Sequence, residues 1–268
     1  MRVTFIGGGV MAEAMIRGIL DRGLAEASDI VASDISAERR SYLSKKYGVI
    51  TTSNNQSATE KAEVIILAVQ PGSLSEVMEE LKGHLQPRQP VLSIVAGTTI
   101  ASVCQGLDHK VVIRVMPNMP AQIGEGVSVW VATSEVKEEE KQKARSILSA
   151  LGKDLFVTNE RYIDMATAVS GSGPAYVFTI IESLIDAAVH IGLPYELARE
   201  LVLQTILGAT HLAQKSGKHP AELRNLVTSP GGTTAEGLLQ LEQGGLRALL
   251  AQAIIASYEK AKALRERK

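Results

Sequence analysis

The sequence contains a single cysteine, Cys104, and few aromatic residues, which make up 4% of its 268 positions. One cysteine cannot form a disulfide within the chain or a cysteine-based zinc site, so we expect a reducing compartment. The five histidines lack the spacing of metal ligands, and no metal site is predicted. The formal net charge of −1 provides no basic field that would attract nucleic acid or a membrane surface.

Long apolar runs are also missing. A helix that spans a membrane needs about 18 apolar residues in succession, and the sequence contains no such uninterrupted run. The first residues, MRVTFIGGGV, lack the pattern of a signal peptide. We therefore expect a cytoplasmic protein with no nucleic-acid or membrane partner. The apolar fraction of 45% and the charged fraction of 21% are typical of a globular protein, and the length permits two domains.

Residues 1–160 alternate short β-like runs with helical segments. Most of the predicted strands are apolar at successive positions, as expected for parallel strands with helices on both faces of the sheet. This alternation predicts an α/β domain with a Rossmann-type, doubly wound sheet. The predicted strands cover residues 2–6, 30–33, 64–69, 91–96, 111–116, 127–132 and 154–157.

Residues 161–268 form a second predicted domain, which is all-helical. The strongest helical segments cover 173–193, 195–217 and 246–268, with shorter ones around 219–227 and 233–243. The segment 174–191 has only a narrow polar stripe, so the rest of its surface must be buried. A two-fold partner could bury it as well as the domain itself could. We expect a homodimer, and a larger ring of dimers remains open.

The clearest motif is FIGGGVMAEAM at 5–15, in which Gly7, Gly9 and Ala12 fit G-x-G-x-x-A between a predicted strand and a predicted helix. Glycines at these positions allow a tight turn and close approach of a pyrophosphate to the start of the helix. The pattern therefore indicates dinucleotide binding. A turn required only for packing is the alternative.

Asp34, at the end of the second strand, bears on the choice of coenzyme. A carboxylate there can accept hydrogen bonds from a ribose 2′-hydroxyl, which suits NADH, and it would repel the 2′-phosphate of NADPH. Several neighbouring side chains could instead solvate that phosphate. These are Ser33, Ser36, Arg39, Arg40 and Asn55. For Arg39 and Arg40, an exposed helix face is the alternative.

Three loops follow later strands at 68–72, 95–99 and 115–120. Because ligands bind outside the carboxyl ends of parallel strands, these loops are expected to line a cleft. Asn118 is the polar side chain of its loop that can both donate and accept hydrogen bonds. We therefore include Asn118 among the expected substrate contacts.

Two glycine-containing stretches in the second half resemble helix starts. SGSG precedes Pro174, and SPGGTT covers 229–234. Bare backbone amides at two such helix N-termini could bind a small anion, such as a carboxylate, without lysine or arginine. Ordinary capping by Ser or Thr side chains is the alternative for each.

Taken together, these motifs resemble the Δ1-pyrroline-5-carboxylate reductase family. FIGGGVMAEAMIRG, LAVQPG, VAGTTI, RVMPNMP, SGSGPAYVF and VTSPGGTTAEGL occur in the family's order across essentially the whole chain. The resemblance implies a Rossmann domain that binds NADPH, with NADH as a further coenzyme, and a helical domain for dimerisation. It implies reduction of the cyclic imine pyrroline-5-carboxylate to L-proline, the last step of proline biosynthesis.

Site residues are also implied by the resemblance. Substrate contacts are expected from the SPGGTT stretch, with Thr234 as the catalytic residue. These contacts are Ser229, Gly231, Gly232, Thr233 and Thr234. The expected coenzyme contacts are Gly7, Gly9, Val10, Met11, Ala12, Asn55, Val69, Gln70, Pro71 and Ala96, together with Ser33 and Asp34. The chain departs from the family at Gln70, often lysine there, and at Asp34, often neutral.

The chemistry also separates this family from two alternatives. A protonated imine is already electrophilic, so its reduction needs no strong base or metal. The β-hydroxyacid dehydrogenases share the two-domain plan, but alcohol oxidation needs a general base, and SGSGPAYVFTIIES lacks the lysine of that family. A nucleotide-sensing module without catalysis would leave the two anion-ready stretches unexplained.

Overall fold

The computed structural model describes residues 1–266 and contains two compact units. One unit comprises Met1–Pro174 together with the chain from Ser257 onward, and the other comprises Ala175–Ala256. The domain boundary between residues 160 and 161 that the sequence suggests stays a prediction.

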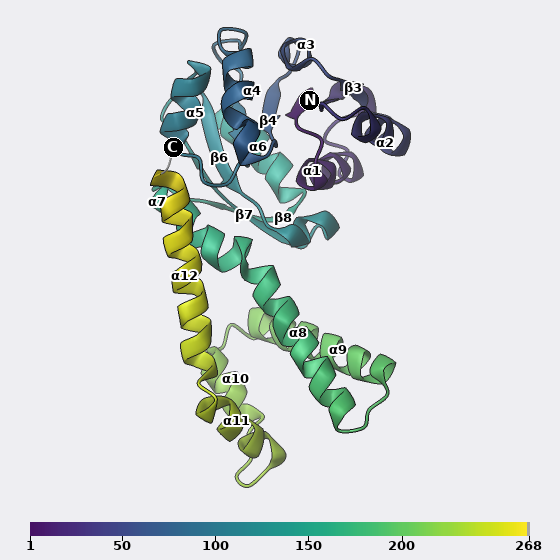
Figure 1. Ribbon diagram of the computed structural model, residues 1–268, viewed down its shortest axis with the longest axis vertical. Coiled ribbons are helices and arrows are strands. Elements are labelled where there is room, and N and C mark those ends of the chain that lie inside the picture. The colour runs from purple at the N-terminus through teal and green to yellow at the C-terminus, as the bar shows by residue number, and fades with distance from the viewer. Residues whose placement is uncertain (267–268) are drawn as a thin grey trace. The chain divides into compact units, whose positions relative to one another are not determined.

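The first unit contains one eight-stranded sheet with the order β3-β2-β1-β4-β5-β6-β7-β8 (Figure 1). Neighbouring strands are parallel except β6 and β7, which are antiparallel. The strands are β1 (Val3–Ile6), β2 (Ile30–Ser33), β3 (Ile50–Thr52), β4 (Val64–Leu67), β5 (Val91–Ser93), β6 (Val112–Met116), β7 (Gly126–Ala132) and β8 (Gly152–Phe156).

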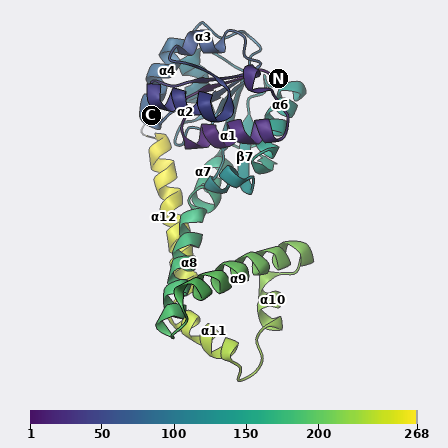
Figure 2. The same ribbon diagram turned by 90° about the vertical axis from the view of Figure 1, so that its right-hand side faces the viewer.

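Helices cover both faces of this sheet (Figures 1 and 2). Two successive residues of β1 show this: Phe5 lies in a buried cluster with residues of α1, α2 and α6, whereas Ile6 lies in a cluster with residues of α4 and α5. A strand buried on both faces must be apolar at successive positions, as the sequence predicts. The helices are α1 (Val10–Asp21), α2 (Ala37–Tyr47), α3 (Asn55–Thr59), α4 (Leu74–Leu81), α5 (Ile100–Leu107), α6 (Glu138–Ser149) and α7 (Arg161–Ala166).

The predicted doubly wound α/β fold is confirmed, with two differences. The edge strand β3 was not predicted, because it is only three residues long and its sequence, ITT, is not buried. The final part of the sheet is not wholly parallel, since β7 turns back beside β6. The short loop between these strands leaves no room for a crossover helix, so an antiparallel pairing follows.

The second unit is helical, as predicted, and the bounds of its helices agree closely with those of the predicted helical segments. Its helices are α8 (Gly173–His190), which begins in the first unit, α9 (Tyr195–Ser216), α10 (Pro220–Leu226), α11 (Thr233–Gln243) and α12 (Leu246–Glu266), which ends in the first unit. The last two residues of the predicted segment 246–268 lie outside the described part of the chain.

Large apolar side chains are exposed along α8 and α9. Phe178 is 54% exposed, and Leu184, Leu201 and Leu207 are exposed to a similar degree. Within the described residues, the helical run Arg161–His190 is also the one segment whose length and composition would allow it to cross a membrane. An apolar surface of this extent on a helix calls for a partner.

The SGSG stretch at 170–173 is not a helix start. A short π-helical segment, Thr167–Gly171, joins α7 directly to α8. The Ser172 N–H donates to the Thr167 carbonyl at 2.8 Å, a bond of the wide π type. The prediction of a helix N-terminus with bare amides is therefore wrong at this position.

Asn118 explains how the chain tolerates Pro174 inside this helical run. Proline has no N–H, so it cannot donate to the Ser170 carbonyl four residues earlier. The Asn118 Nδ2 group donates to that carbonyl instead, at 3.1 Å. Its Oδ1 atom accepts from the Val127 N–H at 2.9 Å. Both ends of this amide therefore hold backbone groups.

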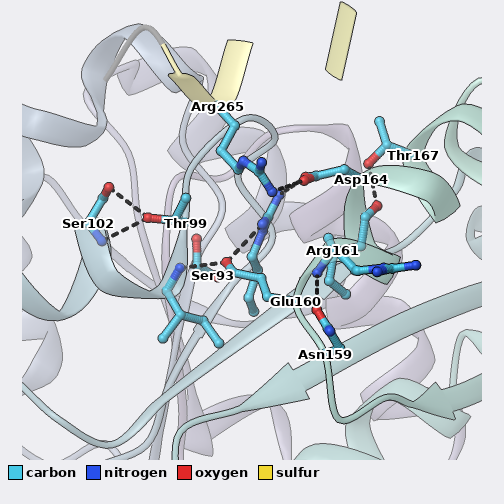
Figure 3. A network of polar contacts seen from close by, with 12 residues as sticks. Ser93, Thr99, Ser102, Asn159, Glu160, Arg161, Asp164, Thr167 and Arg265 are labelled. Atoms are coloured by element: carbon cyan, nitrogen blue, oxygen red, sulfur yellow. Dashed lines mark hydrogen bonds and ion pairs between the residues drawn. The ribbon is translucent and has the colours of Figure 1, made fainter. Parts of the chain in front are cut away.

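A buried guanidinium attaches α7 and α12 to the sheet. Arg114 of β6 is 3% exposed, and its guanidinium donates to Glu160 at 2.8 Å and to Asp164 at 2.9 Å. Asp164 also accepts from Arg265 of α12 at 2.7 Å. Figure 3 shows Arg265 and Asp164 pointing toward each other, with Glu160 nearby. Glu160 also accepts from the N–H of Ile100 at 2.7 Å.

We predict that Asp164→Asn lowers the free energy of unfolding by about 3 kcal/mol, because removing one member of a buried ion pair leaves the other charge uncompensated. Chemical denaturation followed by circular dichroism measures this. Glu138→Gln is the control, because Glu138 forms an exposed 4.0 Å ion pair with Lys141. Its loss should lower the free energy of unfolding by less than about 1 kcal/mol. Equal stability of the two variants would contradict the prediction.

Candidate active site

Most of the predicted coenzyme residues follow the carboxyl ends of neighbouring strands. The order β3-β2-β1-β4-β5 places these strand ends side by side, and the parallel direction brings them to one edge of the sheet. Ligands of doubly wound sheets bind at this edge. Along it lie Gly7, Gly9, Val10, Met11 and Ala12 after β1, Ser33 and Asp34 at the end of β2, Asn55 after β3, Val69, Gln70 and Pro71 after β4, and Ala96 after β5.

The glycine-rich turn fits a pyrophosphate. Gly7 has φ +97°, and a Cβ atom there would lie 2.7 Å from the carbonyl oxygen of Ala68, so a side chain is excluded. Gly9 is the N-cap of α1 and contributes no side chain to the cap. The first N–H groups of a helix have no partner within it. Val10, the first residue of α1, is 62% exposed, so the start of this helix is accessible.

Asp34 holds the turn in shape through both carboxylate oxygens. Oδ2 accepts from the N–H of Gly8 at 2.8 Å, and Oδ1 accepts from the N–H of Ser36 at 2.8 Å. The carboxylate therefore lies between the glycine-rich turn and the loop after β2. This is the position from which an acidic side chain can also reach a ribose hydroxyl.

Ser33 and Asn55 are brought together by the structure. The Ser33 hydroxyl is buried and donates to Asn55 Oδ1 at 2.6 Å. Asn55 Nδ2 in turn donates to Glu80 at 2.7 Å. Ser33 is buried and its hydroxyl already binds Asn55, whereas Asn55 is partly exposed. Asn55 is therefore the more accessible of the two predicted contacts.

Arg39 and Arg40 do not form a free, solvated helix face. Arg40 donates to the carbonyls of Asp34 at 2.6 Å and Ile35 at 3.0 Å. Arg39 donates to the carbonyl of Gly8 and forms an ion pair with Glu13 at 2.6 Å. The exposed-face alternative is therefore wrong for both side chains.

Glu13 lies in the first turn of α1, beside the glycine-rich turn, and nothing in the sequence singled it out. Burial would raise the pKa of this carboxyl, but hydrogen bonds from Arg39, Lys46, Tyr47 and Tyr42 outweigh burial and lower the pKa to about 2. Glu13 is thus ionised throughout the physiological range. Its partners lie about 26 or more residues away along the chain, so no local pattern could have indicated them.

The predicted substrate stretch, SPGGTT, lies in the helical unit. Gly231 adopts φ +68°, and the Gly232 N–H donates to the Ser229 carbonyl at 3.1 Å, which closes the turn. Gly232 is the N-cap of α11, and no side chain among the described residues caps it. Capping by Ser or Thr, the alternative considered for this stretch, is therefore wrong. The amides of Thr233 and Thr234 begin the helix.

Asn118 lies in the first unit, whereas the other predicted substrate residues lie in the second. Its amide is occupied by the carbonyl of Ser170 and the N–H of Val127. Its contact with a substrate stays a prediction. Within residues 1–266, no group of three or more histidine, cysteine or carboxylate side chains could hold a metal ion.

Two family models match the chain. The model described as pyrroline-5-carboxylate reductase dimerisation matches residues 160–264. The model described as NADP oxidoreductase, coenzyme F420-dependent, matches residues 2–97. The first covers nearly all of the helical region, and the second covers the strands that end at the predicted coenzyme edge.

Full-length relatives decide the family. A pyrroline-5-carboxylate reductase of Synechocystis is 39% identical over 98% of both chains, and one of Pseudomonas aeruginosa is 39% identical over 99% of this chain and 97% of its own. The chain belongs to the pyrroline-5-carboxylate reductase family. The family predicted from the motifs is therefore confirmed, against the β-hydroxyacid dehydrogenases and the nucleotide-sensing module.

Solved structures of pyrroline-5-carboxylate reductases agree with this assignment. The enzyme from Coxiella burnetii has a TM-score of 0.90 and 37% identity, with 98% of both chains covered. The enzyme from Plasmodium falciparum, solved with NADP bound, has a TM-score of 0.90 and 32% identity over 99% of this chain and 98% of its own. An NAD(P)H-dependent oxidoreductase with a dimerisation domain follows from these matches.

We predict that Asp34→Ser raises the ratio of kcat/KM with NADPH to kcat/KM with NADH about tenfold, which corresponds to ~1.4 kcal/mol. The reason is the loss of one negative charge beside the position expected for the ribose. Steady-state assays with both coenzymes measure it. Asp29→Ser, at the opposite end of β2, is the matched control. An unchanged ratio in Asp34→Ser would show that the carboxylate serves only the glycine-rich turn.

Proposed function

We propose that this chain reduces Δ1-pyrroline-5-carboxylate to L-proline with NADPH, and with NADH as a second coenzyme, in the last step of proline biosynthesis. The observation that carries the proposal is the match to named pyrroline-5-carboxylate reductases over 98% of the chain at 39% identity. A match of this length includes both the glycine-rich turn and the SPGGTT stretch. A cytoplasmic location is part of the proposal.

The residues at the carboxyl edge of the sheet suit the coenzyme. The turn at Gly7 and Gly9 and the first amides of α1 hold the pyrophosphate, and Asp34 and Asn55 bind at the adenosine ribose. Val69, Gln70, Pro71 and Ala96 follow the next two strands along the same edge. When bound, the coenzyme supplies the hydride for the C=N carbon.

The start of α11 suits the substrate carboxylate. The N–H groups of Thr233 and Thr234 lie in the first turn of a helix whose N-cap is a glycine. The helix dipole favours a negative charge there, and the absence of a Cβ on Gly231 and Gly232 permits close approach. The Ser229 hydroxyl lies directly beside Gly232, where a Cβ atom would clash with its Oγ.

Thr234 is the proposed partner of the ring nitrogen. Its hydroxyl is a poor acid at neutral pH, so it orients the imine by a hydrogen bond more than it transfers a proton. The SPGGTT stretch contains no titratable side chain. A protonated imine is electrophilic without further activation, so positioning is the main contribution that these residues must make.

The proposal is tested by following coenzyme oxidation with pyrroline-5-carboxylate and identifying the product. The purified protein should oxidise NADPH or NADH only when the imine is present, and it should form proline in equal amount. Omission of the imine and an open-chain imine serve as controls. Absence of proline with both coenzymes would overturn the proposed function.

We expect Thr234→Val to lower kcat/KM for the imine by roughly 10- to 1000-fold, the range for the loss of one positioned polar contact. Valine keeps the shape and removes only the hydroxyl. Coenzyme affinity, measured by fluorescence titration, should stay near that of the wild type. Thr228→Val, on the preceding turn, is the control. Full activity, or a loss that follows weaker coenzyme binding, would refute the role of Thr234.

A homodimer built on α8 and α9, or a ring of such dimers, is the proposed assembly. The dimerisation family model covers these helices, and their apolar side chains are exposed in the single chain. Burial of this surface by a second copy also accounts for the apolar run Arg161–His190 without a membrane.

Light scattering at micromolar protein concentration should therefore give a mass of at least twice the 28.6 kDa of one chain. Phe178→Glu should weaken the assembly, because it places a charge in the apolar surface. Glu182→Gln, on the polar stripe of α8, should leave the mass unchanged. A monodisperse and active monomer would contradict the proposed assembly.

A further inference from the structure

One carboxylate binds α2 to α1 beside the glycine-rich turn. Glu13 lies in the first turn of α1, and all of its hydrogen-bond donors come from α2. Oε2 accepts from Arg39 at 2.6 Å, and Oε1 accepts from Tyr47 at 2.8 Å, Tyr42 at 2.9 Å and Lys46 at 3.0 Å. Four donors on a single carboxylate are more than the packing of two helices requires.

Arg39 is held on the turn by these and other contacts. Its Nε donates to the carbonyl of Gly8, and its Nη2 reaches the carbonyl of Gly9 at 3.3 Å. Its guanidinium lies 4.9 Å from the centre of the Tyr42 ring. The side chain is only 24% exposed. Arg39 therefore has a fixed position with a carboxylate as its counter-charge.

Arg39 and Asp34 flank the same glycine. A Cβ atom on Gly8 would lie 3.3 Å from Asp34 Oδ2 and 3.5 Å from Arg39 Cγ. In doubly wound folds, an acidic side chain at the end of the second strand binds a ribose 2′-hydroxyl, and a nearby arginine accommodates a 2′-phosphate. Arg39 is thus a cation near the expected position of the ribose 2′ group, which is a hydroxyl in NADH and a phosphate in NADPH.

Further charges near this position include those of Arg40, Lys46 and Asp34. Arg40 is held by the carbonyls of Asp34 and Ile35, and Lys46 shares Glu13 with Arg39. The counter-charge of Glu13 is therefore divided between two cations. Removing Glu13 would leave Arg39 with an uncompensated charge for a phosphate.

We propose that Glu13 determines coenzyme specificity through Arg39: by neutralising Arg39, it reduces the attraction of this position for a 2′-phosphate and brings the affinities for NADPH and NADH closer together. Glu13 is a positioning residue and touches no substrate. The inference rests on the proposed coenzyme, and it goes beyond Asp34, whose charge acts on the ribose directly.

The test measures dissociation constants for NADPH and NADH by fluorescence titration, without substrate. The ratio of the NADH constant to the NADPH constant should rise about tenfold in Glu13→Gln. It should stay within twofold of wild type in Tyr47→Phe, which removes one donor without changing a charge, and in Glu38→Gln, which removes an exposed carboxylate from the first turn of α2. Both controls must hold for the inference to stand.

The double variant Glu13→Gln/Arg39→Gln separates this route from a general charge effect. The tenfold rise in the ratio of the NADH constant to the NADPH constant should disappear in the double variant, because Arg39 is the group through which Glu13 acts. A gain that persists without Arg39, or an equal gain in Glu38→Gln, overturns the inference. An unchanged ratio in Glu13→Gln overturns it as well.

Lys46→Gln provides a second test should Glu13→Gln fail to fold. Lys46 is 49% exposed. Its removal takes away one of the two cations paired with Glu13 and leaves the charge of that carboxylate to Arg39, so the ratio should fall. The fall should be larger than in Lys45→Gln, which removes the same charge from the neighbouring position. Equal effects of the two lysines would overturn the inference. Failure of the wild type to bind either coenzyme would instead overturn the proposed function.

Discussion

The structure depends on the pairing of one buried guanidinium. Arg114 in β6 cannot be left unpaired in the interior, because an uncompensated buried charge costs several kcal/mol. Glu160 and Asp164 supply the two carboxylates, and both lie at the start of the helical run toward α8. Arg265 completes the network from the end of α12. Both chain segments that lead to the helical unit are thereby attached to the sheet.

The coenzyme edge follows from the order of the strands. Parallel pairing of β3, β2, β1, β4 and β5 collects their carboxyl ends, and the turns that follow carry glycine, proline and short polar side chains in place of catalytic acids and bases. Such a set is suited to binding and orientation. The charged side chains near the glycine-rich turn include those of Asp34, Glu13 and Arg39, and they determine the electrostatic potential there.

Sequence reasoning predicted the elements better than the contacts between them. The apolar strands and the long helices were evident because each carries a local pattern. β3 was not predicted, because it is short and poorly buried. The π-helical junction was not predicted either, because SGSGP is also a pattern of helix starts. The ion pair of Glu13 and Arg39, and the use of Asn118 at Pro174, join residues distant in sequence, which no local pattern can predict.

The central claim is direct hydride transfer from the bound coenzyme to the imine carbon, without a metal or an acid–base residue in the SPGGTT stretch. The most direct test uses NADPH or NADH deuterated at the transferred position of the nicotinamide, followed by mass spectrometry and NMR of the product. We predict proline with one deuterium at the carbon of the former C=N bond. Unlabelled proline, or deuterium at another carbon, would contradict the account.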